Sequence, residues 1–288
     1  MSKKKKIVLA VVLAVLVCLI AAVVFVIIKY PNKLRRMAST VINSFNSGNK
    51  LKLKSVEQDG LESVDVEKFM EDERVSADQS LMLINTQYML SEDFTADVAE
   101  YGESGVYMNL CIQDAYRELA AAVSTEFDTK LYVRSAYRSA QEQQEQVEEN
   151  SEVATAVGAS EHQAGLALDV YVPYFAGMGF LDSDAGVWVN KNCQDYGFII
   201  RYPAYGEKST GVTFEPWHIR YVGLPHAKII AEQKITLEKY VEGLAIGKIY
   251  TYGDYYIERC VDKVLLPGEF ESAVISPDNT GGYIVTFK

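Results

Sequence analysis

The longest apolar run of the sequence lies near its start. Residues 7–28 are 22 hydrophobic residues in succession, and four lysines precede them. A helix needs about 20 apolar residues to cross the hydrocarbon core of a bilayer. A cleaved signal peptide usually has a shorter apolar region, about 7–15 residues, followed by a small-x-small cleavage site. The run ends instead in FVIIKYP. The pattern therefore predicts an uncleaved transmembrane signal anchor over residues 1–29.

Positive charges flank this run on both sides. Lysines occupy positions 3–6, and Lys29, Lys33, Arg35 and Arg36 follow it. The positive-inside rule is therefore nearly balanced, but the cluster before the run is denser and gains the terminal amine. We expect a single-pass protein of the cell membrane with its N-terminus inside and the remaining chain outside the cell.

After the apolar run, the chain divides into three stretches of different composition. Residues 30–77 are polar, at first rich in Asn, Ser and Lys and then acidic, without a visible core pattern, which predicts a stem. Residues 78–244 have the mixed apolar pattern of a globular domain. Residues 245–288 consist of short alternating segments separated by turn residues, which predicts a small β-rich appendage whose aromatic residues form either a binding surface or a small core.

Within residues 78–244, helical and strand-like spacings alternate. Apolar residues spaced three and four apart predict an amphipathic helix over 108–127. Further helices are predicted over 139–150, with Ser139 as the cap, over 187–198, ending at Gly197, and over 224–244. Strands are predicted over 81–85, 131–139, 165–173, 198–203 and 218–223. This order predicts an α+β fold, a small antiparallel sheet with flanking helices.

The charge distribution limits the partners of this domain. Of the 28 Lys and Arg residues, 11 lie in residues 1–54, which contain no Asp or Glu, so the other 17 stand against all 39 acidic residues. Such an acidic domain is not expected to bind nucleic acid. Cys111, Cys193 and Cys260 lie beyond the apolar run without CxxC spacing, and either one disulfide or three buried thiols fits them.

Two of the three histidines lie close to carboxylates. His162 and Asp169 occur in SEHQAGLALD (160–169), and Glu215 and His218 occur in EPWH (215–218). A catalytic zinc has three protein ligands from imidazole nitrogens and carboxylate oxygens and an open position for water. Two histidines and one aspartate meet that number. His226, at the start of a predicted helix, is expected to be a surface or capping residue.

The spacing excludes a helical zinc motif. Pro216 lies between Glu215 and His218, so the pair is not an HExxH helix. A bent strand start would let both side chains face a metal. Asp169 lies in the apolar segment GLALDVYV, where a buried carboxylate without a partner would be costly. The sequence therefore predicts a metal site at which His162, Asp169 and His218 converge.

Three segments together resemble the zinc D-Ala-D-Ala carboxypeptidases of the VanY type. They are SAYRSAQEQ (135–143), SEHQAGLALDV (160–170) and EPWHIRYVG (215–223). The second matches that family's S-x-H-x-x-G-x-A-x-D pattern, and the third matches its E-x-W-H pattern. The likeness extends over roughly residues 78–240. It implies the hedgehog-like fold of D-Ala-D-Ala peptidases, and it covers neither the stem nor the tail.

The resemblance also implies roles for individual residues. Zn²⁺ would be bound by His162, Asp169 and His218, Glu215 would be the catalytic base, and Arg138 would stabilise the oxyanion. Substrate contacts are implied for three further positions: Gln143, Ser160 and Trp217.

The leading hypothesis is a membrane-anchored D,D-carboxypeptidase that removes the terminal D-Ala from peptidoglycan stem peptides. In that family such trimming contributes to glycopeptide resistance, because vancomycin binds the D-Ala-D-Ala end. An L,D-carboxypeptidase acting on tetrapeptides, or a dipeptidase, would use the same metal ligands. A non-catalytic, zinc-stabilised domain that binds the cell wall is the alternative from another class.

Overall fold

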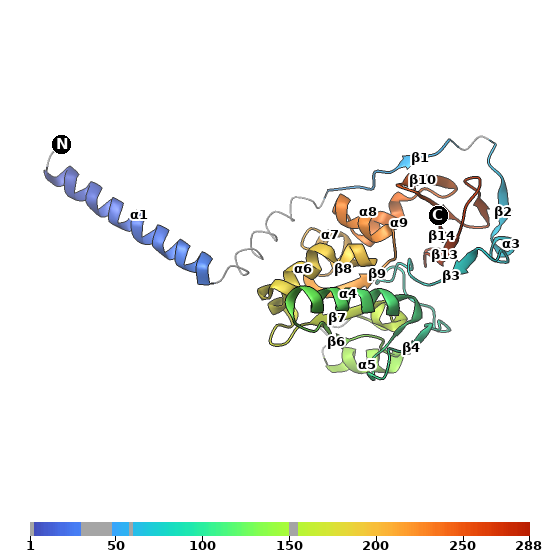
Figure 1. Cartoon of the computed structure of the whole chain (residues 1–288), viewed down its shortest axis with the longest axis horizontal. Helices are drawn as coiled ribbons and strands as arrows, with labels where there is room; N and C mark the ends of the chain where they lie inside the picture. Colours follow the sequence, from blue (N-terminus) through green and yellow to red (C-terminus); the bar gives the residue numbers. More distant parts are fainter. Residues whose placement is uncertain (1–2, 30–47, 58–59, 150–154) are drawn as a thin grey trace.

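The computed structural model describes residues 3–29, 48–57, 60–149 and 155–288 (Figure 1). Helix α1 (Lys3–Lys29) is its first element, and the large apolar side chains between Val12 and Phe25 are 45–60% exposed. Within the described residues, a search for a helix long and apolar enough to span a bilayer finds none. Residues 30–47, the first part of the expected stem, lie outside the described residues.

A four-stranded antiparallel sheet forms the centre of the region that contains the sequence motifs. Its strand order is β6-β7-β9-β8. The strands span Tyr132–Ser135 (β6), Ala167–Tyr171 (β7), Glu215–Tyr221 (β9) and Phe198–Tyr202 (β8). Four of the predicted strand segments therefore form the small antiparallel sheet that the sequence predicts.

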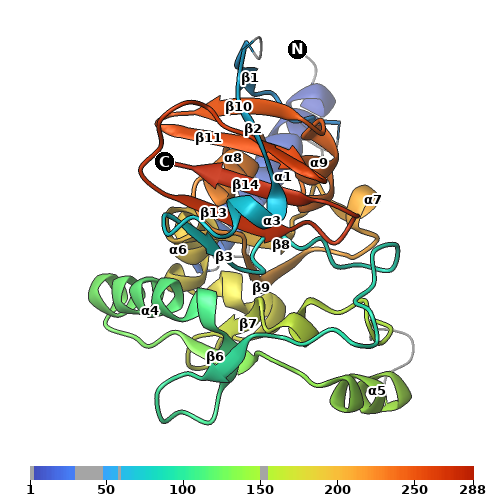
Figure 2. The same cartoon turned by 90° about the vertical axis from the view of Figure 1, so that its right-hand side faces the viewer.

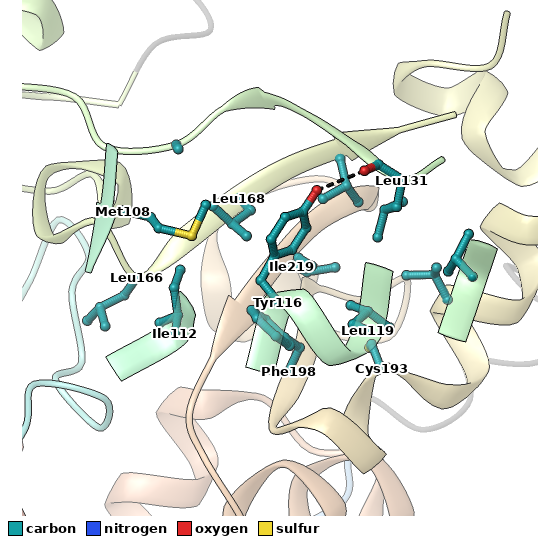
Figure 3. Close-up of a cluster of buried hydrophobic side chains, with 14 of the residues drawn as sticks. Met108, Ile112, Tyr116, Leu119, Leu131, Leu166, Leu168, Cys193, Phe198 and Ile219 are labelled. Carbon is teal, nitrogen blue, oxygen red and sulfur yellow. Dashed lines mark hydrogen bonds between the residues drawn. The ribbon is translucent and has the colours of Figure 1, made fainter. Parts of the chain in front are cut away.

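Helices cover this sheet through an apolar core. They are η1 (Leu110–Ile112), α4 (Gln113–Phe127), η3 (Gly177–Asp182), α6 (Asp184–Asn192) and η4 (Cys193–Tyr196). Tyr116, Leu119 and Val123 of α4 are buried, as their three- and four-residue spacing predicts. Figure 3 shows this core, where the Tyr116 hydroxyl donates a hydrogen bond to the carbonyl of Leu131 at 2.9 Å.

Two smaller elements lie beside the sheet. Strands β4 (Val98–Glu100) and β5 (Tyr107–Asn109) form a hairpin. Helix α5 (Ala140–Glu149) begins with a capping box, because Glu142 N–H donates to Ser139 Oγ at 3.2 Å and Ser139 N–H donates to Glu142 Oε2 at 2.7 Å. The Ser139 cap expected from the sequence is therefore present.

A second, six-stranded sheet joins residues from the expected stem to residues of the tail. Its order is β1-β10-β11-β14-β13-β3, and a separate two-stranded sheet pairs β12 with β2. The tail supplies β10 (Lys248–Tyr252), β11 (Tyr255–Cys260), β12 (Lys263–Leu265), β13 (Ala273–Pro277) and β14 (Tyr283–Phe287). The upstream residues supply β1 (Lys54–Ser55), β2 (Ser63–Asp65), the short helix α3 (Val66–Phe69) and β3 (Val75–Ala77).

A shared core packs this second sheet against the first region. Helices α8 (His226–Gln233) and α9 (Leu237–Gly243) lie behind the six-stranded sheet in Figure 2. Their buried side chains form one cluster with Ile199 of β8 and Ile257 of β11. The short helix α7 (Glu207–Thr210) precedes β9. Leu244, at the expected 244/245 boundary, is buried in the same cluster, and the expected division into domains stays a prediction.

The strand expected over residues 81–85 is not formed. Leu81 and Leu83 are buried, as the apolar pattern predicts, but their segment pairs with no strand. Its backbone is instead bound by other groups, because Leu83 N–H donates to the Asp278 carbonyl and Arg220 donates to the carbonyls of Ser80 and Met82. The strand assignment was therefore wrong.

Glu258 of β11 gives the second sheet a testable pH dependence. Its side chain is fully buried, Oε2 accepts a hydrogen bond from Leu265 N–H at 2.8 Å, and burial raises its pKa to about 7. A carboxyl whose pKa is higher in the folded state stabilises the fold below its unfolded pKa and loses that contribution as pH rises through the folded value. The Glu258→Gln variant cannot ionise, so we expect it to be more stable than the unaltered chain at pH 8.

The measurement is chemical denaturation at pH 5 and pH 8. We expect a gain of roughly 1–3 kcal/mol at pH 8 and little difference at pH 5. Glu271→Gln, at an exposed position, is the matched control and should leave the difference between the two pH values unchanged. Equal effects of Glu258→Gln at both pH values would contradict a buried, neutral carboxyl.

Candidate metal centre and active-site cleft

His162 lies in a tight turn before β7. The 3₁₀ helix η2 (Glu161–Ala164) ends at Gly165 with φ 67°. A Cβ at position 165 would lie 2.6 Å from Val98 Cγ1 and 2.8 Å from Asn109 N, so only glycine fits. His162 Nδ1 lies 2.8 Å from the Ala136 carbonyl, which accepts only from a protonated nitrogen. This bond leaves the Nε2 lone pair of His162 facing Asp169, with Nε2 3.6 Å from Oδ2.

Strand pairing brings the other two predicted ligands together. Asp169 of β7 is directly opposite His218 of β9 in the antiparallel register. Asp169 Oδ1 lies 3.1 Å from His218 Nδ1. The two imidazole rings meet edge to face with centroids 5.0 Å apart. One ligand atom each from His162, Asp169 and His218 lies within 4.8 Å of the others, so the structure places the three together.

This donor set fits a divalent cation. Two imidazoles and one carboxylate from three separate segments are the ligand types of a catalytic zinc site. Asp169 Oδ1 is buried and has no hydrogen-bond partner within the described part of the chain. A buried carboxylate oxygen without a partner is costly, and a bound cation would compensate for it.

Glu215 lies at the start of β9, beside the metal ligands. Its Oε2 is 3.7 Å from His218 Nδ1, and its side chain is 24% exposed. Burial raises the pKa of Glu215, His218 partly opposes this, and the Asp169 carboxylate adds to it. The β8–β9 register is irregular between Ile200 and Tyr202, opposite Glu215, which is the bent strand start that Pro216 favours.

Opposing effects set the charges of the two central ligands. Burial raises the pKa of Asp169, but the adjacent His162 and His218 rings outweigh it and hold that pKa well below its usual range. Burial lowers the pKa of His218, but Asp169 and Glu161 outweigh it and raise that pKa to about 9. The centre therefore favours a positive charge between these side chains.

A cleft of about 450 Å³ opens beside Asp169. Arg134, Arg138 and Trp217 are among the side chains that line it. Burial lowers the pKa of Arg138, and the charge of Asp169 partly offsets this. The guanidinium is oriented by two bonds, from Nη1 to Gln143 Oε1 at 2.7 Å and from Nη2 to Ser135 Oγ at 2.9 Å.

The predicted substrate contacts have different positions in the structure. Trp217 lines the cleft. Gln143 is only 1% exposed, and its amide donates to the Thr155 carbonyl while its oxygen holds Arg138. Gln143 is therefore a buried partner of Arg138 and is not among the residues that line the cleft. Ser160 is buried directly before the η2 turn.

The sequence interpretation did not identify Glu161, which lies beside the centre, and it was wrong to place His226 at the surface. Glu161 is fully buried next to His162, and its Oε2 lies 3.6 Å from His218 Nε2. A charged residue inside the ligand motif was the available signal. His226 is not a surface residue, because it is 3% exposed and its ring bonds the hydroxyls of Tyr240 and Thr286. Burial lowers its pKa to about 3, and it lies outside the metal group.

The fold and the centre define a metallopeptidase of mixed α/β architecture, and comparison with known proteins specifies its kind. A family profile for VanY, D-alanyl-D-alanine carboxypeptidase, matches residues 105–224. The bifunctional D-Ala-D-Ala dipeptidase and carboxypeptidase VanXYC of Enterococcus gallinarum is 34% identical over 188 residues, which are 58% of this chain and 95% of that protein. The chain therefore belongs to the VanY family of zinc-dependent D-alanyl-D-alanine carboxypeptidases.

Other relatives cover less of their own length. A D-alanyl-D-alanine carboxypeptidase of Enterococcus faecium is 34% identical over 182 residues, covering 57% of this chain and 58% of that protein. The chain thus spans little more than half of that relative.

Solved structures extend the likeness. The D,D-pentapeptidase VanY from a VanB-type vancomycin-resistance cassette, in complex with Zn(II), has TM-score 0.51 and 29% identity over 56% of this chain and 98% of its own. The LD-carboxypeptidase LdcB has TM-score 0.52 and 31% identity, and the match covers 68% of this chain and 95% of LdcB. The D,D-dipeptidase VanXYg covers 82% of this chain and 99% of its own with TM-score 0.63, and at 22% identity it supports the fold alone.

Removal of single ligands tests the metal centre. We expect the unaltered chain to hold one zinc ion, and His162→Ala or Asp169→Asn to lose most of it, since two remaining ligands hold zinc weakly. His226→Gln is the matched control, because it changes a buried histidine outside the centre. Zinc per folded chain, measured by elemental analysis after gel filtration, checks this. Full zinc content in the ligand variants would contradict the assigned set.

Proposed function

We propose that this protein is a zinc D,D-carboxypeptidase that removes the terminal D-Ala from peptidoglycan stem peptides. The observation that carries the proposal is the grouping of the His162, Asp169 and His218 ligand atoms, with Glu215 beside His218. This group lies next to a cleft that both Asp169 and Arg138 line. Family membership supports the substrate class.

Each side chain has a role consistent with its position. Zinc held by His162, Asp169 and His218 would supply Lewis-acid chemistry, polarising the scissile carbonyl and lowering the pKa of water. Glu215 accepts a proton from the attacking water while the water oxygen forms a bond to the carbonyl carbon. It then gives that proton to the leaving amine of D-Ala as the C–N bond breaks. Arg138, held by Gln143 and Ser135, stabilises the negative charge of the oxyanion.

An L,D-carboxypeptidase is the second candidate. Its support is the likeness to LdcB, which is comparable to the likeness to VanY. Dipeptidase activity is supported by the bifunctional relative of Enterococcus gallinarum. A non-catalytic zinc scaffold is disfavoured because Glu215 is present and lies 3.7 Å from His218 Nδ1. An enzyme with D,D-carboxypeptidase activity would remove the D-Ala-D-Ala end that vancomycin binds and so contribute to glycopeptide resistance.

Product analysis distinguishes these activities. We expect D-Ala release from a stem pentapeptide ending in D-Ala-D-Ala, with the tetrapeptide accumulating, and loss of activity with a chelator that zinc restores. Glu215→Gln should keep zinc and lower kcat by about 10²–10⁴-fold. D-Ala release only from the tetrapeptide would favour the L,D activity, and cleavage of free D-Ala-D-Ala would indicate the dipeptidase. An active Glu215→Gln variant would contradict the assigned base.

We further propose that the protein is anchored in the cell membrane through residues 1–29, with the catalytic domain outside. The 22 apolar residues at 7–28, the lysines before them and the exposed apolar side chains of α1 support this. A peptidoglycan substrate would lie on the same side as the domain.

Fractionation tests the anchor. We expect the full chain in the membrane pellet, extracted by detergent and not by alkaline carbonate, because apolar burial rather than charge would hold it. Protease added to intact spheroplasts should digest the catalytic domain. Extraction by carbonate alone, or protection of the domain, would overturn the anchor or its orientation.

A further inference from the structure

Glu161 is held between two buried arginines. Its Oε1 accepts a hydrogen bond from Arg201 Nε and another from Arg220 Nη1, both at 2.6 Å. The carboxylate is completely buried, and both arginine side chains are at most 1% exposed. A charged group at this depth is costly unless it is paired, and charge-assisted bonds of this length compensate for that cost.

The two arginines are fixed in turn by separate parts of the chain. Arg201 of β8 donates to both carboxylate oxygens of Glu238 on α9, at 2.6 and 3.1 Å. Arg220 of β9 donates to the backbone carbonyls of Ser80 and Met82, at 2.9 and 2.8 Å. The position of Glu161 is therefore set by two strands, a helix and the segment before the hairpin.

The second oxygen of Glu161 faces a metal ligand. Oε2 lies 3.6 Å from His218 Nε2, and both atoms are buried without a hydrogen-bond partner among the residues described. The other ring nitrogen of His218, Nδ1, faces Asp169 at 3.1 Å and Glu215 at 3.7 Å. A neutral imidazole carries one proton, so a proton on Nε2 leaves the Nδ1 lone pair directed at the metal centre.

We infer that Glu161 is a positioning residue that accepts the Nε2 proton of His218 and so presents Nδ1 of that ring to the metal. The inference rests on the metal site of the proposed enzyme. The two histidine ligands are thus oriented differently. His162 is fixed through Nδ1 by the Ala136 carbonyl and presents Nε2, whereas His218 is fixed through Nε2 by a carboxylate and presents Nδ1.

The Glu161→Gln variant separates positioning from packing. The amide oxygen would face the two arginines, because an NH₂ group cannot accept from them, and the NH₂ group would then donate to His218 Nε2. The ring proton moves to Nδ1, where it blocks the metal. Glu238→Gln is the matched control, since Glu238 is also a buried partner of Arg201 but does not contact His218.

We expect Glu161→Gln to weaken zinc affinity about 10–100-fold and to change the visible spectrum of the Co²⁺-loaded protein. Chelator competition and Co²⁺ spectra, recorded on folded full-length chains, provide these readouts. Glu238→Gln should lower stability while its zinc affinity and Co²⁺ spectrum match those of the unaltered chain. Equal zinc affinities in the two variants would overturn the inference.

Imidazole ¹⁵N spectra of the unaltered, metal-loaded chain decide the question even if Glu161→Gln does not fold. With three histidines in the sequence, the rings are readily assigned. We expect His218 to carry its proton on Nε2 and to bind the metal through Nδ1. Metal bound to Nε2 of His218 would overturn this inference and leave the proposed function standing. An unaltered chain that takes up no zinc would overturn the proposed function and this inference with it.

Discussion

Pairing of β7 with β9 is the interaction on which the metal centre depends. It places Asp169 directly opposite His218, so two ligands that are 49 positions apart in the sequence meet through backbone hydrogen bonds. Side chains of directly opposed residues lie on the same face of a sheet, about 4.5–5.5 Å apart at Cβ. A one-residue slip of this register would turn one ligand to the opposite face. His162 is added by a turn that only Gly165 permits.

Helices α8 and α9 and the six-stranded sheet pack against the region that contains this centre and support it. The buried side chains of α8 and α9 contact both sheets, and Glu238 of α9 binds Arg201, which binds Glu161 beside His218. The tail thus shares a core with the elements that carry the ligands. A rigid surrounding shell matters because catalytic groups act only within narrow limits of geometry.

The sequence predicted the parts of the fold whose signals are local. The α4 spacing, the Ser139 cap and the His162, Asp169 and His218 set each depend on residues close together or on a specific motif. Strands β1, β2 and β3 could not be predicted, because two or three residues show no alternation and their partners lie about 200 positions away. The burial of Glu161 and Gln143 was not predicted, because burial of a polar side chain depends on tertiary neighbours, which a single sequence does not reveal.

The six-stranded sheet has a consequence for the order in which the chain can assemble. Strand β3 (Val75–Ala77) pairs in parallel with β13 (Ala273–Pro277), and β14 (Tyr283–Phe287) lies between β13 and β11. During synthesis the early strand must wait until nearly the whole chain has emerged before its neighbours exist. Loop-closure entropy makes such distant contacts slow to form. The four-stranded sheet and its helices can therefore form first. The apolar side chains of α8 and α9 would then stay exposed until β14 has been synthesised and the six-stranded sheet can form.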